Sequence, residues 1–223
     1  MTTLKDFFAR HPRTALGFSG GTDSAYLLYA GTSLGADVRP YYIKTQFQPA
    51  FELADARRLA DELGVELTVI EADILADDAV AANPPDRCYH CKRALFTLLA
   101  ERAASDGYSE LIDGTNASDD PGDRPGTRAL RELRVLSPLR ECGITKADVR
   151  RLSREAGLFT YAKPSYACLA TRVPTGRRIE AGALGRIEAA ESALRALGYD
   201  DLRVRLCEGG VRLELPESEL ERA

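Results

Sequence analysis

The sequence predicts an α/β fold built on a doubly wound parallel sheet. Short apolar runs alternate along the chain with longer stretches that have the 3.6-residue spacing of amphipathic helices. A glycine-rich turn follows the first apolar run directly and leads into the first helical stretch. Strands that alternate with helices in this way pair in parallel, with helices covering the faces of the sheet.

The elements of this sheet can be placed in order along the chain. Four apolar runs are bounded by glycine, proline or polar residues, and they predict strands at Thr14–Phe18, Val38–Lys44, Glu66–Glu71 and Glu110–Asp113. The stretches between them have helical periodicity, which predicts helices at Asp23–Leu34, Phe51–Leu63 and Cys88–Ala104. Each strand is therefore followed by a segment that can cross over the sheet.

The second half of the chain is more irregular. From Thr115 to Ser137 it is polar and rich in Gly, Pro, Asp and Arg, which is typical of a long functional loop. Thr145 predicts the N-cap of a helix that ends at Ala156, with Asp148 completing a variant of the capping box. Another irregular stretch follows over Lys163–Arg178.

The C-terminal part predicts a separate small α+β unit. A helix at Leu184–Leu197 precedes two short strands, Leu202–Cys207 and Val211–Leu215, which have the length of a β-hairpin. We therefore expect a main domain over residues 1–165 and a small C-terminal unit over residues 166–223.

Composition limits the classes of protein. The chain has 223 residues, of which 44% are hydrophobic and 29% charged, as in ordinary globular proteins. No run reaches the roughly 18 apolar residues of a membrane helix, and charges interrupt the N-terminal stretch where a signal peptide has its apolar core. These features predict a cytoplasmic protein with no membrane partner.

The balance of acidic and basic residues disfavours a general nucleic-acid-binding protein. There are 34 Asp and Glu against 30 Lys and Arg, whereas such binders are usually basic. Residues 124–154 are the exception, with nine basic residues (eight Arg and Lys146) against three acidic ones. This run is either a solvated helical face or a site for phosphates or carboxylates.

The sharpest motif lies between the first strand and the first helix. It reads Ser19-Gly20-Gly21-Thr22-Asp23-Ser24. The glycines let the backbone turn tightly, and the free amides of the helix start favour an anion. Ser19, Thr22 and Ser24 offer hydroxyl donors, and Asp23 can cap the helix or hold Mg²⁺. No Gly-Lys-Ser/Thr follows, so the motif is a phosphate loop of another kind than the Walker loop.

The five cysteines also carry information. An odd count without a signal peptide indicates a reducing compartment, where cysteines are thiols, metal ligands or reactants. Cys88 and Cys91 lie one turn apart at a predicted helix start, which favours the thiolate form. Cys168 lies in an irregular loop close to Arg172, the setting of a reactive or ligating thiol, although an ordinary buried side chain fits as well. Cys142 and Cys207 match no motif and are expected to be structural.

A C-x₂-C pair alone is a metal or redox half-site. A zinc site would need two further ligands, and neither His11 nor His90, the two histidines of the sequence, has a recognisable zinc spacing. A thioredoxin-like pattern is also missing around the pair.

Several motifs together extend the interpretation. The strings are SGGTDS, CYHCK, DGTNASD, RPGTRAL, SPL and KPSYACLATRVPTG, of which KPSYACLATR is the most specific. In order and spacing the chain resembles, over roughly residues 14–215, the LarE-type ATP-dependent sulfur insertases of the PP-loop ATP pyrophosphatase superfamily. The family usually continues with another helix, a strand and a Gly-rich tail beyond the last strand seen here.

The resemblance implies both a fold and a reaction. The fold is adenine nucleotide alpha hydrolase-like. Family members use ATP and Mg²⁺ to adenylate a carboxylate of pyridinium-3,5-biscarboxylic acid mononucleotide, and sulfur then displaces AMP to give a thiocarboxylate for a nickel-pincer cofactor. A sulfide or cysteine-derived sulfur donor and a homo-oligomer are implied as well.

The resemblance also implies roles for residues. ATP would be bound by the phosphate loop together with Asp113, Gly114, Thr115 and Asn116. Cys168 would either give up its own sulfur or hold a [4Fe-4S] cluster with Cys88 and Cys91, and the presence of all three thiols favours the cluster. Lys92 and Arg172 would stabilise developing charge. The substrate phosphate would be bound by Glu191, Arg203 and Arg205.

Two other functions remain open from the residues. A tRNA thiolation enzyme also uses an SGGxDS loop and cysteines, but the acidic balance and the KPSYACLATR string count against it. A non-catalytic adenine-nucleotide or zinc-binding module would share the loop or the thiols without the reaction. Metal analysis and co-purified tRNA would distinguish the three.

Overall fold

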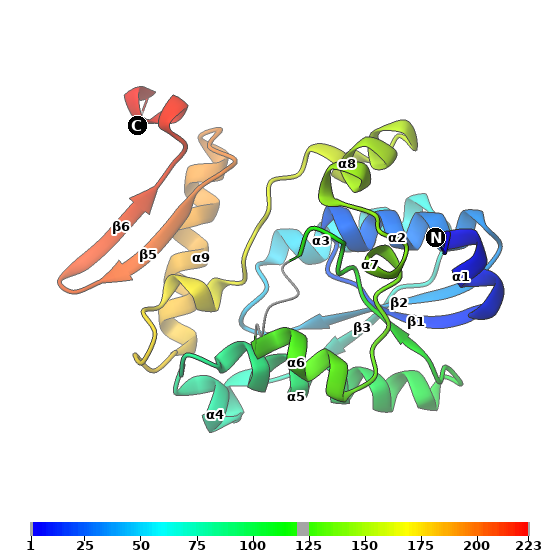
Figure 1. The fold of residues 1–223 in the computed structure, drawn as a ribbon. Coiled ribbons are helices and arrows are strands. Elements are labelled where there is room, and N and C mark those ends of the chain that lie inside the picture. The colour runs from blue at the N-terminus through cyan, green and yellow to red at the C-terminus, as the bar shows by residue number, and fades with distance from the viewer. Residues whose placement is uncertain (1, 120–124, 223) are drawn as a thin grey trace.

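The main body is a four-stranded parallel sheet between two layers of helices (Figure 1). The computed structural model describes residues 2–119 and 125–222. The strands are β1 (Arg13–Gly17), β2 (Asp37–Lys44), β3 (Thr68–Glu71) and β4 (Leu111–Ile112), in the order β3-β2-β1-β4. All three pairings are parallel, which confirms the α/β fold that the sequence predicts.

Helices cover both faces of this sheet. One layer contains α1 (Leu4–Arg10), α2 (Thr22–Ser33), α3 (Ala50–Glu62), α7 (Pro138–Glu141) and α8 (Lys146–Glu155). The other contains α4 (Asp78–Ala81), α5 (Arg87–Ser105) and α6 (Pro125–Glu132). Burial on both sides explains the apolar character of the strands. On β2, Tyr42 packs into the core on the α2 side while Tyr41 packs against α5, because successive side chains point to opposite faces.

Two parts of the second half differ from the prediction. The expected loop over Thr115–Ser137 was wrong in its later part, because α6 forms there; residues 120–124 of that stretch lie outside the described residues. Proline fits the first turn of a helix, and Ala129 and Leu130 on α6 become buried, so tertiary packing decides the conformation. The capping box at α8 is confirmed, since Thr145 and Asp148 accept each other's backbone amides at 3.2 and 3.1 Å.

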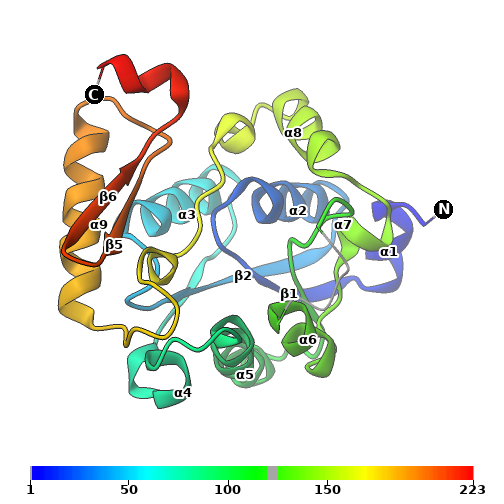
Figure 2. The same ribbon diagram turned by 60° about the vertical axis from the view of Figure 1, so that its left-hand side comes forward.

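The C-terminal unit consists of one helix and one hairpin (Figure 2). Helix α9 (Ala181–Ala196) packs against β5 (Arg203–Cys207), which pairs antiparallel with β6 (Gly210–Glu214). Its apolar core, which includes Ile187 and Val204, continues into Phe47 and Val80 of the main body. The shared core fixes the unit beside the sheet. Among the described helices none is long and apolar enough to cross a membrane.

Candidate active site

The topology itself marks a position for ligand binding. β1 has β2 on one side and β4 on the other, so the chain reverses its direction of progress across the sheet at β1. In open parallel sheets ligands bind beyond the carboxyl ends of the strands at such a switch point. Two segments singled out in the sequence follow these strand ends, Ser19–Ser24 after β1 and Asp113–Asn116 after β4.

The loop after β1 has the geometry of an anion site. Gly20 has φ +69°, and a Cβ there would lie 3.1 Å from the Glu52 carbonyl oxygen, so both the conformation and the close approach to α3 require glycine. Gly21 is the N-cap of α2. The amides of residues 22–24 have no acceptor within the helix and are available to a phosphate.

The hydroxyl groups of this loop have different roles. Thr22 is buried and its Oγ1 donates to the Thr160 carbonyl at 2.9 Å, which ties the loop to the segment after α8. The Ser24 hydroxyl lies 3.1 Å from Ser19 Oγ and 3.2 Å from the Gly21 carbonyl oxygen. Ser19 is exposed. The hydroxyl that the loop presents to a ligand is therefore that of Ser19, while Thr22 holds the loop in place.

Asp23 connects three segments at the strand ends. One of its carboxylate oxygens pairs with Lys146 Nζ at 2.5 Å, and the other accepts from Asn116 Nδ2 at 3.3 Å. Asp23 does not cap α2, so its carboxylate remains at the edge of the site, a quarter exposed. Of the basic run, as far as the structure describes it, Lys146 is the residue that reaches the site.

The loop after β4 is shaped by Asp113 and Gly114. Asp113 is buried and accepts hydrogen bonds from the hydroxyls of Thr115 and Ser137 at 2.5 and 2.7 Å. A Cβ on Gly114 would lie 2.9 Å from the backbone nitrogen of Ser24, so only glycine lets this loop approach the start of α2. The two loops therefore pack against each other through backbone.

A single cavity joins the phosphate loop to a cysteine. It has a volume of about 310 Å³. Ser19, Gly21, Thr22 and Asp23 line one part of it. The rest is lined by Gln48, Glu52, Lys146, the segment Lys163–Tyr166 and Cys168. Residues that the sequence separates by more than a hundred positions thus face one small volume.

The loop that carries Cys168 is fastened on both sides. The backbone amide of Leu169 donates to the Phe47 carbonyl at 2.9 Å, which ties the loop to the end of β2. Arg172, almost fully buried, pairs with Glu191 of α9 at 2.8 Å. Glu191 also accepts from the Tyr166 hydroxyl at 2.6 Å. Glu191 and Arg172 therefore bind each other, and neither lines the cavity of the phosphate loop.

The three cysteines singled out in the sequence lie in one region. Burial raises the pKa of Cys91 to about 12, with the neighbouring Cys168 and Cys88 acting in the same direction. Burial also raises the pKa of Cys168, with Cys88 acting in the same direction. The expectation that the helix start favours thiolate is wrong for Cys91, because desolvation outweighs it. Among the described residues, no group of three His, Cys, Asp or Glu side chains is arranged to hold a metal ion.

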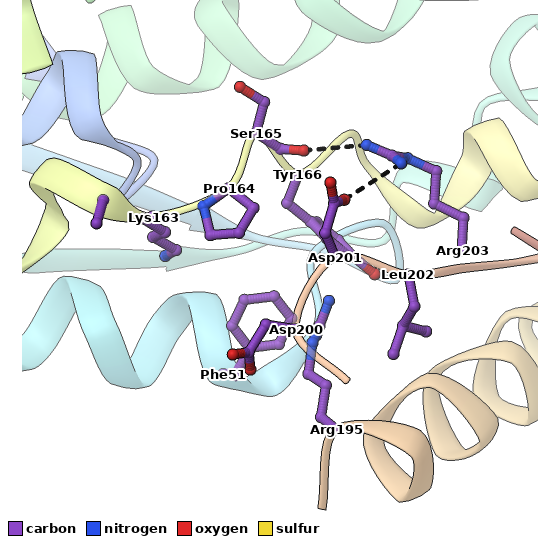
Figure 3. A pocket seen from close by; sticks show the side chains of 11 residues that line it. Phe51, Lys163, Pro164, Ser165, Tyr166, Arg195, Asp200, Asp201, Leu202 and Arg203 are labelled. Atoms are coloured by element: carbon purple, nitrogen blue, oxygen red, sulfur yellow. Dashed lines mark hydrogen bonds and ion pairs between the residues drawn. The ribbon is translucent and has the colours of Figure 1, made fainter. Parts of the chain in front are cut away.

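The remaining predicted residues lie at different places. The stem of Lys92 packs against α6, where a Cβ on Gly126 would meet its Cδ at 3.0 Å. Arg203 lines a second cavity, of about 360 Å³, which shares the Lys163–Tyr166 segment with the first (Figure 3). Arg205 pairs with Glu214 at 2.7 Å and lines another cavity together with Arg172. The two arginines thus face different cavities.

Sequence reasoning did not single out seven residues of the first cavity: Gln48, Glu52, Lys146 and the segment Lys163–Tyr166. Lys163 Nζ pairs with Asp55 at 2.6 Å and donates to the Gly20 carbonyl at 3.2 Å, so it supports the phosphate loop from outside. Its place in the string KPSYACLATR is the signal that could have found it. No sequence signal distinguishes Glu52, because its position is that of an ordinary polar residue in an amphipathic helix.

Comparison with known proteins gives the family. No family model matches the chain. It is 33% identical over 222 residues to the pyridinium-3,5-bisthiocarboxylic acid mononucleotide synthase of Lactiplantibacillus plantarum, an alignment that covers 99% of this chain and 79% of that protein. The chain belongs to the LarE-like family of PP-loop ATP pyrophosphatases.

Other relatives agree with this family assignment. An uncharacterized protein of Synechocystis is 35% identical over 224 residues, covering 99% of this chain and 83% of its own length. The tRNA-specific 2-thiouridylase MnmA of Thermotoga petrophila is 24% identical, covering 68% of this chain and 54% of that enzyme. The LarE-like chain is therefore homologous to enzymes that insert sulfur with ATP.

Proposed function

We propose that this LarE-like chain adenylates a carboxylate of a small nucleotide-like substrate and replaces the AMP with sulfur, giving a thiocarboxylate. The observation that carries the proposal is the cavity in which the phosphate loop and Cys168 face one another. Adenylation needs a pyrophosphate site and transfer needs a sulfur atom beside it. The name of the Lactiplantibacillus plantarum relative makes pyridinium-3,5-biscarboxylic acid mononucleotide the first substrate to test.

The loops that follow β1 and β4 carry out the first half-reaction, adenylation of the carboxylate. The amides of residues 22–24 and the Ser19 hydroxyl bind the pyrophosphate part of ATP, and Lys146 neutralises charge beside it. Asp23 is the carboxylate that would hold Mg²⁺, since carboxylate oxygens are ligands that Mg²⁺ prefers. The segment Asp113–Asn116 completes the nucleotide site. Attack of the substrate carboxylate on the α-phosphorus then expels pyrophosphate.

The region of Cys88, Cys91 and Cys168 carries out the second half-reaction, sulfur transfer. The thiols of Cys88, Cys91 and Cys168 have the donor chemistry of a [4Fe-4S] cluster, and they lie within electrostatic range of one another. A cluster with three such ligands would supply an open iron for a transferable sulfide. The alternative source is the sulfur of Cys168 itself. Arg172 positions this loop through its salt bridge with Glu191. Lys92, in the first part of α5, packs against Gly126 of α6.

Substrate recognition belongs to the C-terminal unit. Arg203 lines the cavity next to the reaction site, and its contacts with Asp201 and the Ser165 carbonyl, both 3.3 Å, are longer than those of Arg205, so it is the first candidate to bind a substrate phosphate. Arg205 contacts the Thr171 carbonyl at 2.5 Å and Glu214, so it would need to exchange these partners for a ligand. Glu191 supports both arginines indirectly by accepting from the Val204 amide at 2.9 Å between them.

Anaerobic turnover with ATP, Mg²⁺, sulfide and candidate carboxylates, followed by mass spectrometry, tests the function. We expect pyrophosphate, AMP and a product in which sulfur replaces a carboxylate oxygen. Absence of pyrophosphate with every carboxylate would contradict the proposal. The similarity to MnmA makes tRNA the alternative sulfur acceptor. If co-purified tRNA gains sulfur in the same assay, tRNA and not a small carboxylate is the substrate.

A further inference from the structure

Glu52 is a carboxylate without a partner in the reaction cavity. It lies in the first turn of α3 and lines the cavity together with the phosphate loop and Cys168. Its carboxylate makes no hydrogen bond or ion pair with any residue that the structure describes. A half-buried acid left unpaired beside a reaction site is a candidate for proton transfer.

The charged groups around Glu52 already have partners. Lys163 pairs with Asp55 and with the Gly20 carbonyl, and Lys44 on β2 donates to the Gln48 carbonyl. On α9, the Arg195 guanidinium lies 4.2 Å above the Phe51 ring and is shown beside it in Figure 3, and Glu188 accepts from the Ala50 amide. The buried phenol of Tyr42 is a further titratable neighbour.

These surroundings set the protonation of Glu52. Burial raises its pKa to about 7, the negative charge of Asp55 acts in the same direction, and Lys163, Arg195 and Lys44 oppose both. The group is therefore divided between acid and carboxylate near neutral pH. General acid–base catalysis is most efficient when the pKa lies near the working pH.

The proposed reaction needs such a group. The sulfur nucleophile, a thiol or hydrosulfide, carries a proton that must leave as the sulfur bonds to the acyl carbon, and Glu52 lines the same cavity as Cys168. The other ionisable side chains that line the cavity are occupied or unsuitable: Asp23 pairs with Lys146, Lys163 is a cation, and Tyr166 donates to Glu191. Glu52 remains.

We propose that Glu52 is the general base of the sulfur-transfer half-reaction, an inference that rests on the proposed function. As the sulfur of Cys168, or of hydrosulfide at the same place, forms its bond to the acyl carbon, the carbon–oxygen bond to AMP breaks. AMP leaves with that electron pair, and the proton of the sulfur moves to the Glu52 carboxylate, from which it passes to solvent. Where the sulfur is that of Cys168, its bond to Cβ then breaks with loss of the Cα proton, which frees the thiocarboxylate and leaves dehydroalanine. No oxidant or reductant is needed.

Measuring adenylation and sulfur transfer separately distinguishes a general base from a residue that binds ATP. Glu52→Gln is compared with the wild type and with Glu62→Gln, which removes an exposed carboxylate at the end of the same helix. Rapid-quench measurements follow pyrophosphate and thiocarboxylate between pH 5.5 and 8.5. We expect Glu52→Gln to release pyrophosphate at the wild-type rate and to transfer sulfur at least about 100-fold more slowly, without the rise in rate around pH 7. Glu62→Gln behaves as the wild type.

Three results would overturn the proposal. One is wild-type sulfur transfer in Glu52→Gln, another is an unchanged pH profile, and the third is an equal loss of both half-reactions, which would place Glu52 in ATP binding. If Glu52→Gln does not fold, Glu52→Asp replaces it, and this variant must keep the pH-dependent rise because it keeps a carboxylate.

A second measurement does not depend on the proposed function. If the wild type releases no pyrophosphate, the proposed function is refuted. The effect of Glu52 on the reactivity of Cys168 can still be measured. Alkylation of Cys168 by iodoacetamide, in protein purified without iron and quantified by mass spectrometry, then decides. Because the thiolate is the form that reacts and the nearby negative charge of Glu52 disfavours it, we expect Glu52→Gln to react several-fold faster than the wild type at pH 8.5. Equal rates would show that the Glu52 carboxylate does not lie close enough to this sulfur to act as its base.

Discussion

Arg172 and Glu191 form a salt bridge of 2.8 Å in which both side chains are almost completely withdrawn from solvent, with 0% and 2% exposed. Arg172 follows Cys168 in the same loop and also donates to the Ala167 carbonyl at 2.9 Å. Glu191 comes from α9 and holds Tyr166, on the other side of Cys168. The pair therefore fixes the position of the thiol by bonding its loop to the C-terminal unit at two points.

Removing one member of this pair should be severely destabilising. Glu191→Ala leaves the Arg172 guanidinium buried without its counter-charge, a situation that costs about 3–5 kcal/mol. Urea denaturation measures the change in the free energy of unfolding. The control is Glu155→Ala, which removes an exposed partner of Arg151 and should change the stability by less than about 0.5 kcal/mol. Similar effects of the two substitutions would mean that the buried pair is unimportant for the fold.

Asp23→Ala should abolish pyrophosphate release and leave the fold intact. The side chain is partly exposed and pairs with Lys146, so its loss costs little stability, whereas the site loses the carboxylate proposed to hold Mg²⁺. A coupled pyrophosphate assay measures the activity, and circular dichroism checks the fold. Asp61→Ala, an exposed aspartate on α3, is the control. Unchanged pyrophosphate release would contradict the adenylation site.

The cysteine substitutions should fall into two groups. Cys88→Ala, Cys91→Ala and Cys168→Ala should each lose iron, brown colour and sulfur transfer while adenylation continues. Cys142→Ala and Cys207→Ala should keep all of these, because they lie outside the cysteine region. Anaerobic iron and sulfide analysis measures the cluster.

The sacrificial alternative predicts a different pattern for the same proteins. Wild-type protein would turn over once and lose about 34 Da, the mass of H₂S released as Cys168 becomes dehydroalanine. Cys88→Ala would remain active for that single turnover. Intact-mass spectrometry after the reaction distinguishes the two sulfur sources.

Arg203 and Arg205 should differ in their effects on the substrate. Arg203→Ala removes a guanidinium from the cavity next to the reaction site, and a hydrogen bond of this charged type contributes about 1.5–3 kcal/mol. We expect substrate affinity to fall at least tenfold and ATP affinity to stay unchanged in calorimetric titrations. With Arg205→Ala added, a further loss would show that both bind the substrate phosphate, as the resemblance implies. Equal weakening of ATP binding would place these residues elsewhere.

The pKa of Glu52 makes a prediction about stability. A carboxyl whose pKa is raised in the folded state, here to about 7 from 4.5, contributes stability below pH 4.5 that is lost as the pH rises through 7. One pKa unit corresponds to about 1.4 kcal/mol. Allowing for the partial exposure of the group, Glu52→Gln should stabilise the protein by about 1–2 kcal/mol at pH 8 and have little effect at pH 4. Thermal unfolding at the two pH values measures this, and a pH-independent effect would contradict the raised pKa.

The sheet and the phosphate loop were predictable because their signals are local. A buried strand such as β1 is a short apolar run, and the loop after it is a contiguous string of glycines and hydroxyl residues. The capping box of Thr145 and Asp148 is equally local, since both partners lie within one helical turn.

The rest of the site depends on contacts between distant segments. Helix α6 is stabilised by burial against α5, which the polar sequence around Gly126 does not reveal. Glu52 is distinguished from other acids only by the Lys163 segment and Cys168 folding over it. The mutual pairing of Arg172 with Glu191 likewise comes from the meeting of a loop with α9, whereas motif comparison assigns each of them to a ligand.

The position of β1 inside the sheet affects how the protein is made. Its partner β2 follows closely in the chain, whereas its other partner β4 aligns Leu111 and Ile112 with Ala15 and Leu16. At about 5–20 residues per second a ribosome needs roughly 5–20 s to reach β4 after completing β1. During this interval one edge of an apolar strand stays open, and Gly114 has not yet closed against α2. We therefore expect the nascent chain to require protection by chaperones until its fourth strand has emerged.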